Sequence, residues 1–180
     1  LSSAIILRLI SQDKLILADS TNFEVYMDII DRKIIRELQN NARLSNQELA
    51  EKVNLSPSPC LRRVRRLEKS GVLIGYTAQV DQEQFGLPIN AFVSIRLEKQ
   101  DHISVRNFET CINDLDEVME CYLMTGSRDY QMRVVSADLK SYERFIREKL
   151  TCLPGLASIE ASFAFGNVKN KNVFPAVPLA

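Results

Sequence analysis

The first regular pattern in the chain begins after Met27, where apolar residues recur three or four positions apart with charged residues between them. These positions are Ile30, Ile34, Ile35 and Leu38. Such spacing is typical of an amphipathic helix with one buried face. It predicts a helix that begins near Asp28 and ends near Asn40-Asn41.

Two further helices are predicted from signals at their ends. Ser45 has Glu48 three residues later, which forms a capping box at the start of a short helix. Ser56 stands before Pro57 and begins the next helix as its N-cap. Proline at the first helical position costs no hydrogen bond, because the N–H that it lacks would have no partner within the helix. Gly71 ends that helix. Three helices with a tight turn between the second and third are typical of a helix-turn-helix domain.

The third predicted helix has an apolar face and a basic face, because successive residues are about 100° apart around a helix. The apolar face holds Cys60, Val64 and Leu67. Arg62 and Arg66 lie on the opposite face, and Arg63 and Arg65 lie on its flanks. Acidic residues are nearly absent from the basic side until Glu68. This favours contact with DNA over the alternative, an ordinary solvated face.

Beyond Gly71 the pattern becomes extended. The segment VLIGYTAQVD predicts a strand that leaves the DNA-binding unit, and Asp81–Pro88 predicts a hinge because it holds a glycine and a proline. From Ile89 the apolar residues alternate at period two, which predicts a half-buried strand.

The remaining elements alternate between helical and extended patterns. They are a helix around Val105–Leu115, strands at 118–125 and 129–136, a helix at 138–150, and a strand at 159–165. The two middle strands are joined by Gly126-Ser127-Arg128, which predicts a hairpin. The order βαββαβ is that of a ferredoxin-like domain, with both helices on one face of an antiparallel sheet. The fold class is therefore α+β.

The other face of this sheet is expected to carry Phe92, Cys121, Leu123 and Val135. These side chains are too apolar to remain in water. The sequence therefore predicts that the sheet packs on a second copy of the chain, in an obligate dimer or a larger assembly.

The charge is unevenly divided, although 23 basic and 23 acidic residues give a net charge of zero. Residues 27–75 carry 10 basic and 6 acidic residues, whereas residues 76–166 carry 9 basic and 14 acidic residues. Only the first module is suited to a polyanion. We divide the chain into an extension at 1–26, a helix-turn-helix domain at 27–75, a strand and hinge at 76–88, a ferredoxin-like domain at 89–166 and a tail at 167–180. Met27 is interpreted as the natural start, with a docked strand or helix at 1–26 as the alternative.

Several classes of protein are excluded by what the sequence lacks. No apolar run reaches the roughly 18–20 residues that span a bilayer. The four cysteines include no CxxC pair, so zinc and thioredoxin-type sites are not expected. No nucleophile stands at a recognisable spacing from a base, and there is no metal-ligand cluster or phosphate-binding glycine loop. We therefore predict that the protein is not an enzyme and requires no cofactor. We expect it to be located in the cytoplasm, associated with the nucleoid.

Three stretches resemble the Lrp/AsnC family of prokaryotic transcription regulators. They are MDIIDRKIIRELQNNARLSNQELAEKVNLSPSPCLRRVRRLEKSGVLIGYTA, TGSRDYQMRVVSAD and LPGLASIEASFAFGNVKN. Similarity to the leucine-responsive branch is closest through SPSPCLRRVRRLE and ECYLMTG. The resemblance implies a winged-type helix-turn-helix domain and a ferredoxin-like effector domain. It also implies dimers that assemble into tetramers or octamers, and an amino acid as the effector bound where dimers meet.

The expected DNA contacts come from the start and outer face of the third helix, since recognition helices read bases mainly through their N-terminal residues. Arg62 or Arg63 is expected to pair with a guanine edge, and Arg65, Arg66 and Lys69 with phosphates. The remaining candidates are Ser56 and Ser58 on this helix, and Ser45, Asn46 and Gln47 at the start of the second helix.

The expected effector site is the hairpin, with Asp129 as the partner of an α-ammonium group and the turn amides as partners of a carboxylate. Its residues are Met124, Thr125, Gly126, Ser127, Arg128, Asp129 and Tyr130, completed by Ser162 and the facing copy. Ordinary turn residues are the alternative. Arg128 and Gln131 stand where the family often has apolar residues, which makes a polar or acidic amino acid, or no effector, conceivable.

Three other functions compete with an effector-controlled regulator. Ferredoxin-like domains also occur in enzymes and their regulatory subunits. A DNA-organising protein without an effector would share the basic helix, and its signature would be weak sequence preference with steep salt dependence. A small-molecule-binding protein without DNA binding is disfavoured by the arginine stripe.

Overall fold

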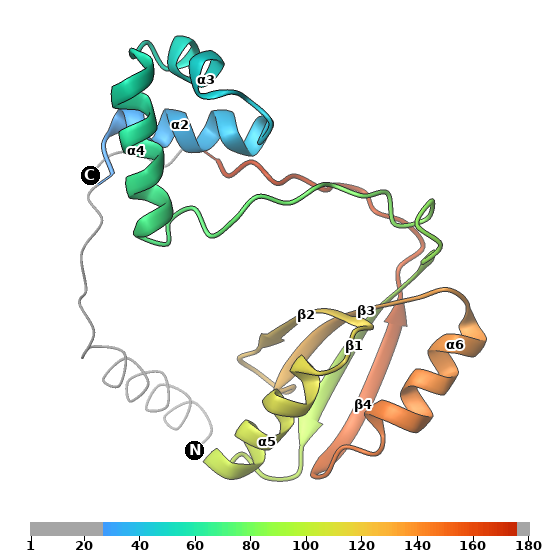
Figure 1. The fold of residues 1–180 in the computed structure, drawn as a ribbon. Helices are drawn as coiled ribbons and strands as arrows, with labels where there is room; N and C mark the ends of the chain where they lie inside the picture. Colours follow the sequence, from blue (N-terminus) through green and yellow to red (C-terminus); the bar gives the residue numbers. More distant parts are fainter. Residues whose placement is uncertain (1–26, 176–180) are drawn as a thin grey trace. The chain divides into compact units, whose positions relative to one another are not determined.

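The computed structural model describes residues 27–175, which form two compact units (Figure 1). The first unit comprises the described residues up to Gln79 together with those from Lys169 onward, and the second comprises Val80–Val168. The chain thus leaves the first unit and returns to it. The expectation for residues 1–26, and the end of the predicted tail at 176–180, lie outside the described residues. No helix within residues 27–175 is long and apolar enough to cross a membrane.

The first unit contains the three predicted helices. These are α2 (Ile29–Asn40), α3 (Asn46–Lys52) and α4 (Pro57–Lys69). Asp28 caps α2 in a capping box with Asp31, and Ser45 caps α3 in the predicted box with Glu48. Ser56 occupies the N-cap position of α4, but its side chain makes no capping hydrogen bond.

The helices enclose a small apolar core that fixes the angle of α4. Its buried apolar residues are Ile34, Leu38, Leu49, Ala50, Val53, Cys60 and Leu67. The turn between α3 and α4 is tight because Asn54 adopts a positive φ of 57° and the Leu55 N–H donates to the Ala50 carbonyl at 2.9 Å. The Asn46 side-chain amide donates to the Pro57 carbonyl at 2.9 Å, which links the starts of the two helices.

The strand predicted for VLIGYTAQVD is wrong. Residues 72–80 contain no strand, and Ile74, Tyr76 and Val80 are exposed. An apolar run becomes a strand only where another strand supplies ladder partners, and no described strand pairs with this segment. The predicted hinge at 81–88 contains a turn, in which the Phe85 N–H donates to the Asp81 carbonyl at 2.9 Å.

The second unit has the predicted βαββαβ order. Its elements are β1 (Ile89–Leu97), α5 (His102–Asn113), β2 (Val118–Leu123), β3 (Tyr130–Ser136), α6 (Leu139–Arg144), the π-helical continuation η2 (Phe145–Leu150) and β4 (Leu156–Phe163). The strands form one antiparallel sheet in the order β2-β3-β1-β4. The core lies between this sheet and the helices, where Val93, Ile95, Met132, Val134 and Phe145 are buried.

The open face of the sheet differs from the prediction. Cys121 pairs with Met132 and Leu123 with the buried Tyr130, so both point toward the helices rather than away from them. The cause is a register shift between Val118 and Glu120, because an extra residue exchanges the two faces of a strand. Only Phe92 and Val135 lie on the expected face, where their partners are Ser162 and Asn90. Val135 is only 4% exposed within the single chain, so of the four residues only Phe92 leaves apolar surface there.

The open face is largely polar and its side chains are bonded to one another. Arg133 donates to Asn90 at 3.2 Å and to Gln82 at 2.8 Å, and forms an ion pair with Glu120 at 3.2 Å. The Ser94 hydroxyl donates to Gln131 at 2.8 Å. This face therefore presents bonded polar groups around isolated aromatic residues rather than a continuous apolar surface.

Candidate nucleic-acid interface and effector site

The exposed cations of α4 form the candidate DNA-reading surface. Arg62, Arg65 and Lys69 are exposed, and within residues 27–175 they form no ion pair. Ser56 and Ser58 are exposed at the start of the same helix. The structure therefore places five of the predicted DNA-binding residues on the accessible side of α4.

Arg63 and Arg66 are held by the first helix of the domain instead. One Arg63 guanidinium nitrogen lies 2.7 Å from a carboxylate oxygen of Asp28 and 2.9 Å from one of Asp31. Arg66 forms an ion pair with the other oxygen of Asp31, whose side chain is fully buried. Arg66 was expected to project from the outer face, but its long side chain turns back toward the start of α2. The basic stripe is therefore partly neutralised within the protein.

The carboxylates of this cluster are oriented by the start of α2. The Asp31 N–H donates to Asp28 at 2.9 Å, and the Asp28 N–H donates back to Asp31 at 3.1 Å. The hydrogen bond from the Asp31 amide, with a further contribution from Arg63, holds the pKa of Asp28 below its usual value. The positive end of a helix stabilises carboxylates at its first turn. Asp28 and Asp31 were missing from the sequence-based site, although an acid at helical spacing from Ile34 and Leu38 could have indicated a buried charge that needs partners.

The predicted residues at the start of α3 serve largely in local structure. The Ser45 hydroxyl donates to the Glu48 carboxylate at 2.7 Å. This hydrogen bond is the main cause that lowers the pKa of Glu48, and the hydrogen bond from the Ser45 amide adds to it. Asn46 is used in the turn before α4. Gln47 is exposed, with a 3.4 Å bond to Glu51. Of the three, Gln47 is the one whose side chain is exposed and only weakly engaged.

Asp129 closes the hairpin rather than standing free in it. One carboxylate oxygen accepts the Leu97 N–H at 2.7 Å, and the other accepts the Gln100 amide at 2.6 Å. The Asp129 N–H donates to the Ile95 carbonyl at 2.8 Å, and its carbonyl accepts the Met124 N–H at 2.8 Å. Both carboxylate oxygens are thus engaged at the end of β1, which differs from the expectation of a carboxylate awaiting an ammonium group.

The other hairpin residues divide between surface and core. Met124, Thr125, Gly126 and Ser127 are exposed, and Gly126 has a φ of 128°, which side-chain-bearing residues rarely adopt. Tyr130 lies in the core, where its ring contacts Phe108 with centroids 4.5 Å apart and its hydroxyl donates to Glu109 at 2.9 Å. Burial, aided by Glu109, raises the pKa of Tyr130.

The Arg128 side chain reaches from the hairpin to β4, and Ser162 lies further along that strand. Arg128 donates to the Ser158 hydroxyl at 3.1 Å and forms an ion pair with Glu160. Ser162 is exposed and pairs with Phe92, four residues beyond Ser158. At about 3.3 Å per residue, Ser162 lies roughly 13 Å from Ser158 and about 7 Å from Glu160, the two β4 partners of Arg128. Ser162 therefore lies beyond the part of β4 that Arg128 contacts.

Taken together, the structure defines a helix-turn-helix domain with a basic helix and a second, ferredoxin-like domain. Residues 27–74 match the family of winged helix-turn-helix DNA-binding domains, and residues 90–174 match the Lrp/AsnC ligand binding domain. The chain belongs to the Lrp/AsnC family of transcriptional regulators.

Relatives of this chain are regulators and not enzymes. The Bkd operon transcriptional regulator of Pseudomonas aeruginosa is 45% identical over 149 residues, covering 83% of this chain and 97% of that protein. The leucine-responsive regulatory protein of Escherichia coli is 38% identical, covering 81% and 89%. Among solved structures, a transcriptional regulator of Neisseria meningitidis in complex with L-Met matches with a TM-score of 0.79 at 32% identity, covering 83% and 97%. The predicted family, fold class and regulatory function are confirmed.

Proposed function

We propose that α4 enters the major groove of double-stranded DNA and that Arg62 and Arg65 are its principal side chains. The observation that carries this proposal is the division of charge on α4. Arg63 and Arg66 are bonded to Asp28 and Asp31, whereas Arg62, Arg65 and Lys69 form no ion pair with residues 27–175. Recognition helices read bases mainly from their N-terminal half, so Arg62 is suited to a guanine edge through two parallel hydrogen bonds, and Arg65, in the second half of α4, to a phosphate. Lys69, at the far end, is suited to a phosphate.

Arg62→Ala should weaken specific DNA binding by about 1–3 kcal/mol, because it removes a base contact and a cation together. The slope of log K against log salt should also become shallower by about 0.9 if this cation neutralises one phosphate. Fluorescence anisotropy with a selected operator over a salt series measures both quantities. Arg106→Ala, which removes an exposed arginine from α5, is the matched control. Equal affinities for the two variants would exclude Arg62 from the interface.

We further propose that the effector is an amino acid and that it binds at hairpin residues 124–128, between copies of the chain. The match to the ligand binding domain and the relative solved with L-Met support an amino acid. The separation of Ser162 from the part of β4 that Arg128 contacts supports a site completed by a facing copy. Arg128, already beside Ser158 and Glu160, favours an effector with a polar or acidic side chain.

This arrangement requires homodimers, which we propose assemble into tetramers or octamers in the cytoplasm, at the nucleoid. Phe92 and Tyr122 are the exposed aromatic residues of the open sheet face that such a partner would cover. The polar network around them supplies groups that a second copy can match.

Purified protein should be stabilised by one or a few of the twenty amino acids in a thermal-shift screen. A ligand at about 100 times its dissociation constant adds roughly 2.7 kcal/mol when it binds only the folded state. An amino acid that raises Tm and also changes operator binding supports the effector proposal. No shift with any amino acid, together with weak sequence preference and a steep salt dependence, would favour the DNA-organising alternative.

A further inference from the structure

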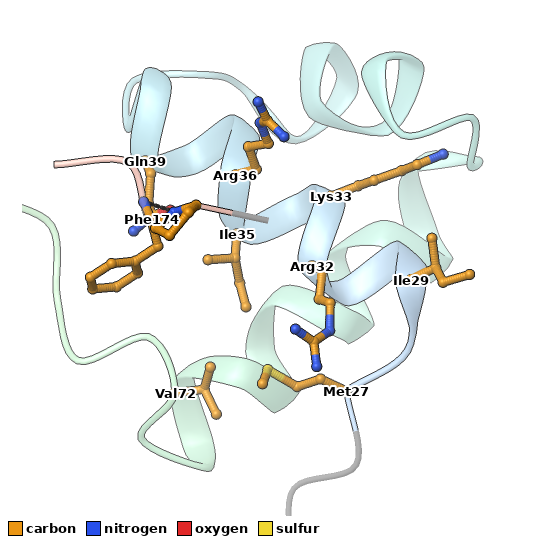
Figure 2. Close-up of a pocket in the computed structure, with 10 residues that line it drawn as sticks. Met27, Ile29, Arg32, Lys33, Ile35, Arg36, Gln39, Val72 and Phe174 are labelled. Atoms are coloured by element: carbon orange, nitrogen blue, oxygen red, sulfur yellow. Dashed lines mark hydrogen bonds between the residues drawn. The ribbon is translucent and has the colours of Figure 1, made fainter. Parts of the chain in front are cut away.

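The tail of the chain contacts α2 through a paired hydrogen bond. The Gln39 side-chain nitrogen donates to the Asn172 carbonyl at 3.1 Å, and its side-chain oxygen accepts the Phe174 N–H at 3.3 Å (Figure 2). A primary amide that bonds both groups of a backbone in this way holds an extended segment as a neighbouring strand would. The contact joins residues more than 130 positions apart in the sequence.

The tail also borders an apolar cavity on α2. The cavity has a volume of about 570 Å³, and its apolar lining includes Met27, Ile35, Val72 and Phe174. Figure 2 shows Phe174 beside Gln39, with Ile35 and Val72 on the adjoining side of the cavity. Met27, Ile35 and Val72 also pack against the core that Ile34 and Leu38 form. The α2 groove, as we call it, therefore lies on the outer side of that core, with Phe174 of the tail as one of its walls.

The linker and the tail reach the same end of α2. A second cavity of about 710 Å³ is lined by the C-terminal end of α2, by linker residues 75–79 and by Asn172 of the tail. The chain leaves the first unit after Gln79 and returns at Lys169, so both covalent connections to the second unit meet this unit near Asn40.

We propose that the α2 groove is a docking site for the chain's own tail, residues 169–175, and that the docked tail is a strap. It gives the DNA-binding domain a second tether to the effector domain in addition to the linker. Docking depends on the Gln39 amide and on the apolar groove. The groove is rimmed by Lys33 and Arg36, and the tail itself carries Lys169 and Lys171, which are of the same sign.

The contacts that hold the strap on α2 are exposed and can open in the native protein. Phe174 remains 74% exposed while docked, and both hydrogen bonds to Gln39 are exposed to water. Exposed contacts of this kind open far more readily than the core of the domain. The docked and released states should therefore exchange in the native protein, and hydrogen exchange should detect the difference.

Hydrogen exchange of the full chain tests the docking directly. In Gln39→Leu the Phe174 amide loses its acceptor, and amides of the tail should exchange roughly tenfold faster, since one modest hydrogen bond corresponds to about that factor. Gln84→Leu makes the same replacement at an exposed position of the second unit and should leave the tail unchanged. Phe174→Ala should likewise release the tail, whereas Phe165→Ala, at a fully exposed phenylalanine, should not. Unchanged tail exchange in both Gln39→Leu and Phe174→Ala would overturn the proposal.

A mixed assembly identifies whose tail occupies the groove. Chains with Gln39→Leu keep an intact tail, and chains with Phe174→Ala keep an intact groove. When the two are produced together, docking within each chain predicts that neither tail regains protection. Recovery of protection in the Gln39→Leu tail would show that it docks on a second copy, and would overturn a strap within one chain.

Discussion

Asp31→Ala is expected to lower the free energy of unfolding of the helix-turn-helix domain by about 3 kcal/mol, near the lower end of values for breaking a buried ion pair. Asp31 is fully buried and accepts from Arg63 at 2.9 Å, with Arg66 on its other oxygen. It also completes the capping box of α2 by accepting the Asp28 N–H. The alanine variant removes all of these bonds and leaves a void between α2 and α4.

Hydrogen exchange of α2 and α4 in the full chain measures this loss, because the two units need not unfold together. Glu51→Ala, which removes an exposed carboxylate from α3, is the control and should change exchange little. Asp31→Asn separates charge from volume, since it fills the same space but pairs less well with two guanidinium groups. If Asp31→Ala is no more damaging than Glu51→Ala, the ion pairs do not stabilise the domain.

If α4 reads DNA as proposed, the ion pairs with Asp31 limit the free charge of this helix. Two of the four arginines on α4 are directed toward α2, so the free cations are concentrated on one side of the helix. Phosphate contacts are sequence-independent and strengthen with every free cation. A recognition helix that retains only a few free cations depends more on base contacts, which carry the sequence information.

The sequence predicts local structure well where a short-range rule decides it. The capping box at Ser45 and Glu48, the stop at Gly71 and the βαββαβ order all depend on neighbours within a few residues. The strand expected after Gly71 fails because an apolar run does not reveal whether a ladder partner exists. The faces of Cys121 and Leu123 fail because one bulge before Glu120 reverses the alternation, and nothing in the local pattern marks it.

The site was harder to predict because side-chain direction depends on distant residues. Arg63 and Arg66 occupy the helical positions that were expected, but their guanidinium groups follow carboxylates 32 and 35 residues away. Asp129 lies in the expected hairpin, yet its oxygens are engaged by the end of β1. The contact of Gln39 with the tail spans nearly the whole chain and leaves no trace in periodicity or capping.

Asp129→Ala should destabilise the effector domain by about 2 kcal/mol, because it leaves a backbone donor of a buried strand without a partner. Leu97 is only 4% exposed, and its N–H donates to Asp129 at 2.7 Å. An unsatisfied buried donor costs about 1–3 kcal/mol, and the exposed bond from Gln100 adds less.

The same substitution should loosen the hairpin and thereby weaken effector binding, while the affinity of α4 for DNA remains. Thermal unfolding and amino-acid titration of Asp129→Ala measure the two effects together. Asp116→Ala is the control, because it removes an exposed aspartate from the loop before β2. Loss of the effector response at unchanged stability would assign Asp129 to direct contact with the effector. If Asp129→Ala instead loses both stability and the effector response, and both return together when the domain is stabilised by other means, Asp129 supports the hairpin. That is the result that the bonds of Asp129 to the end of β1 predict.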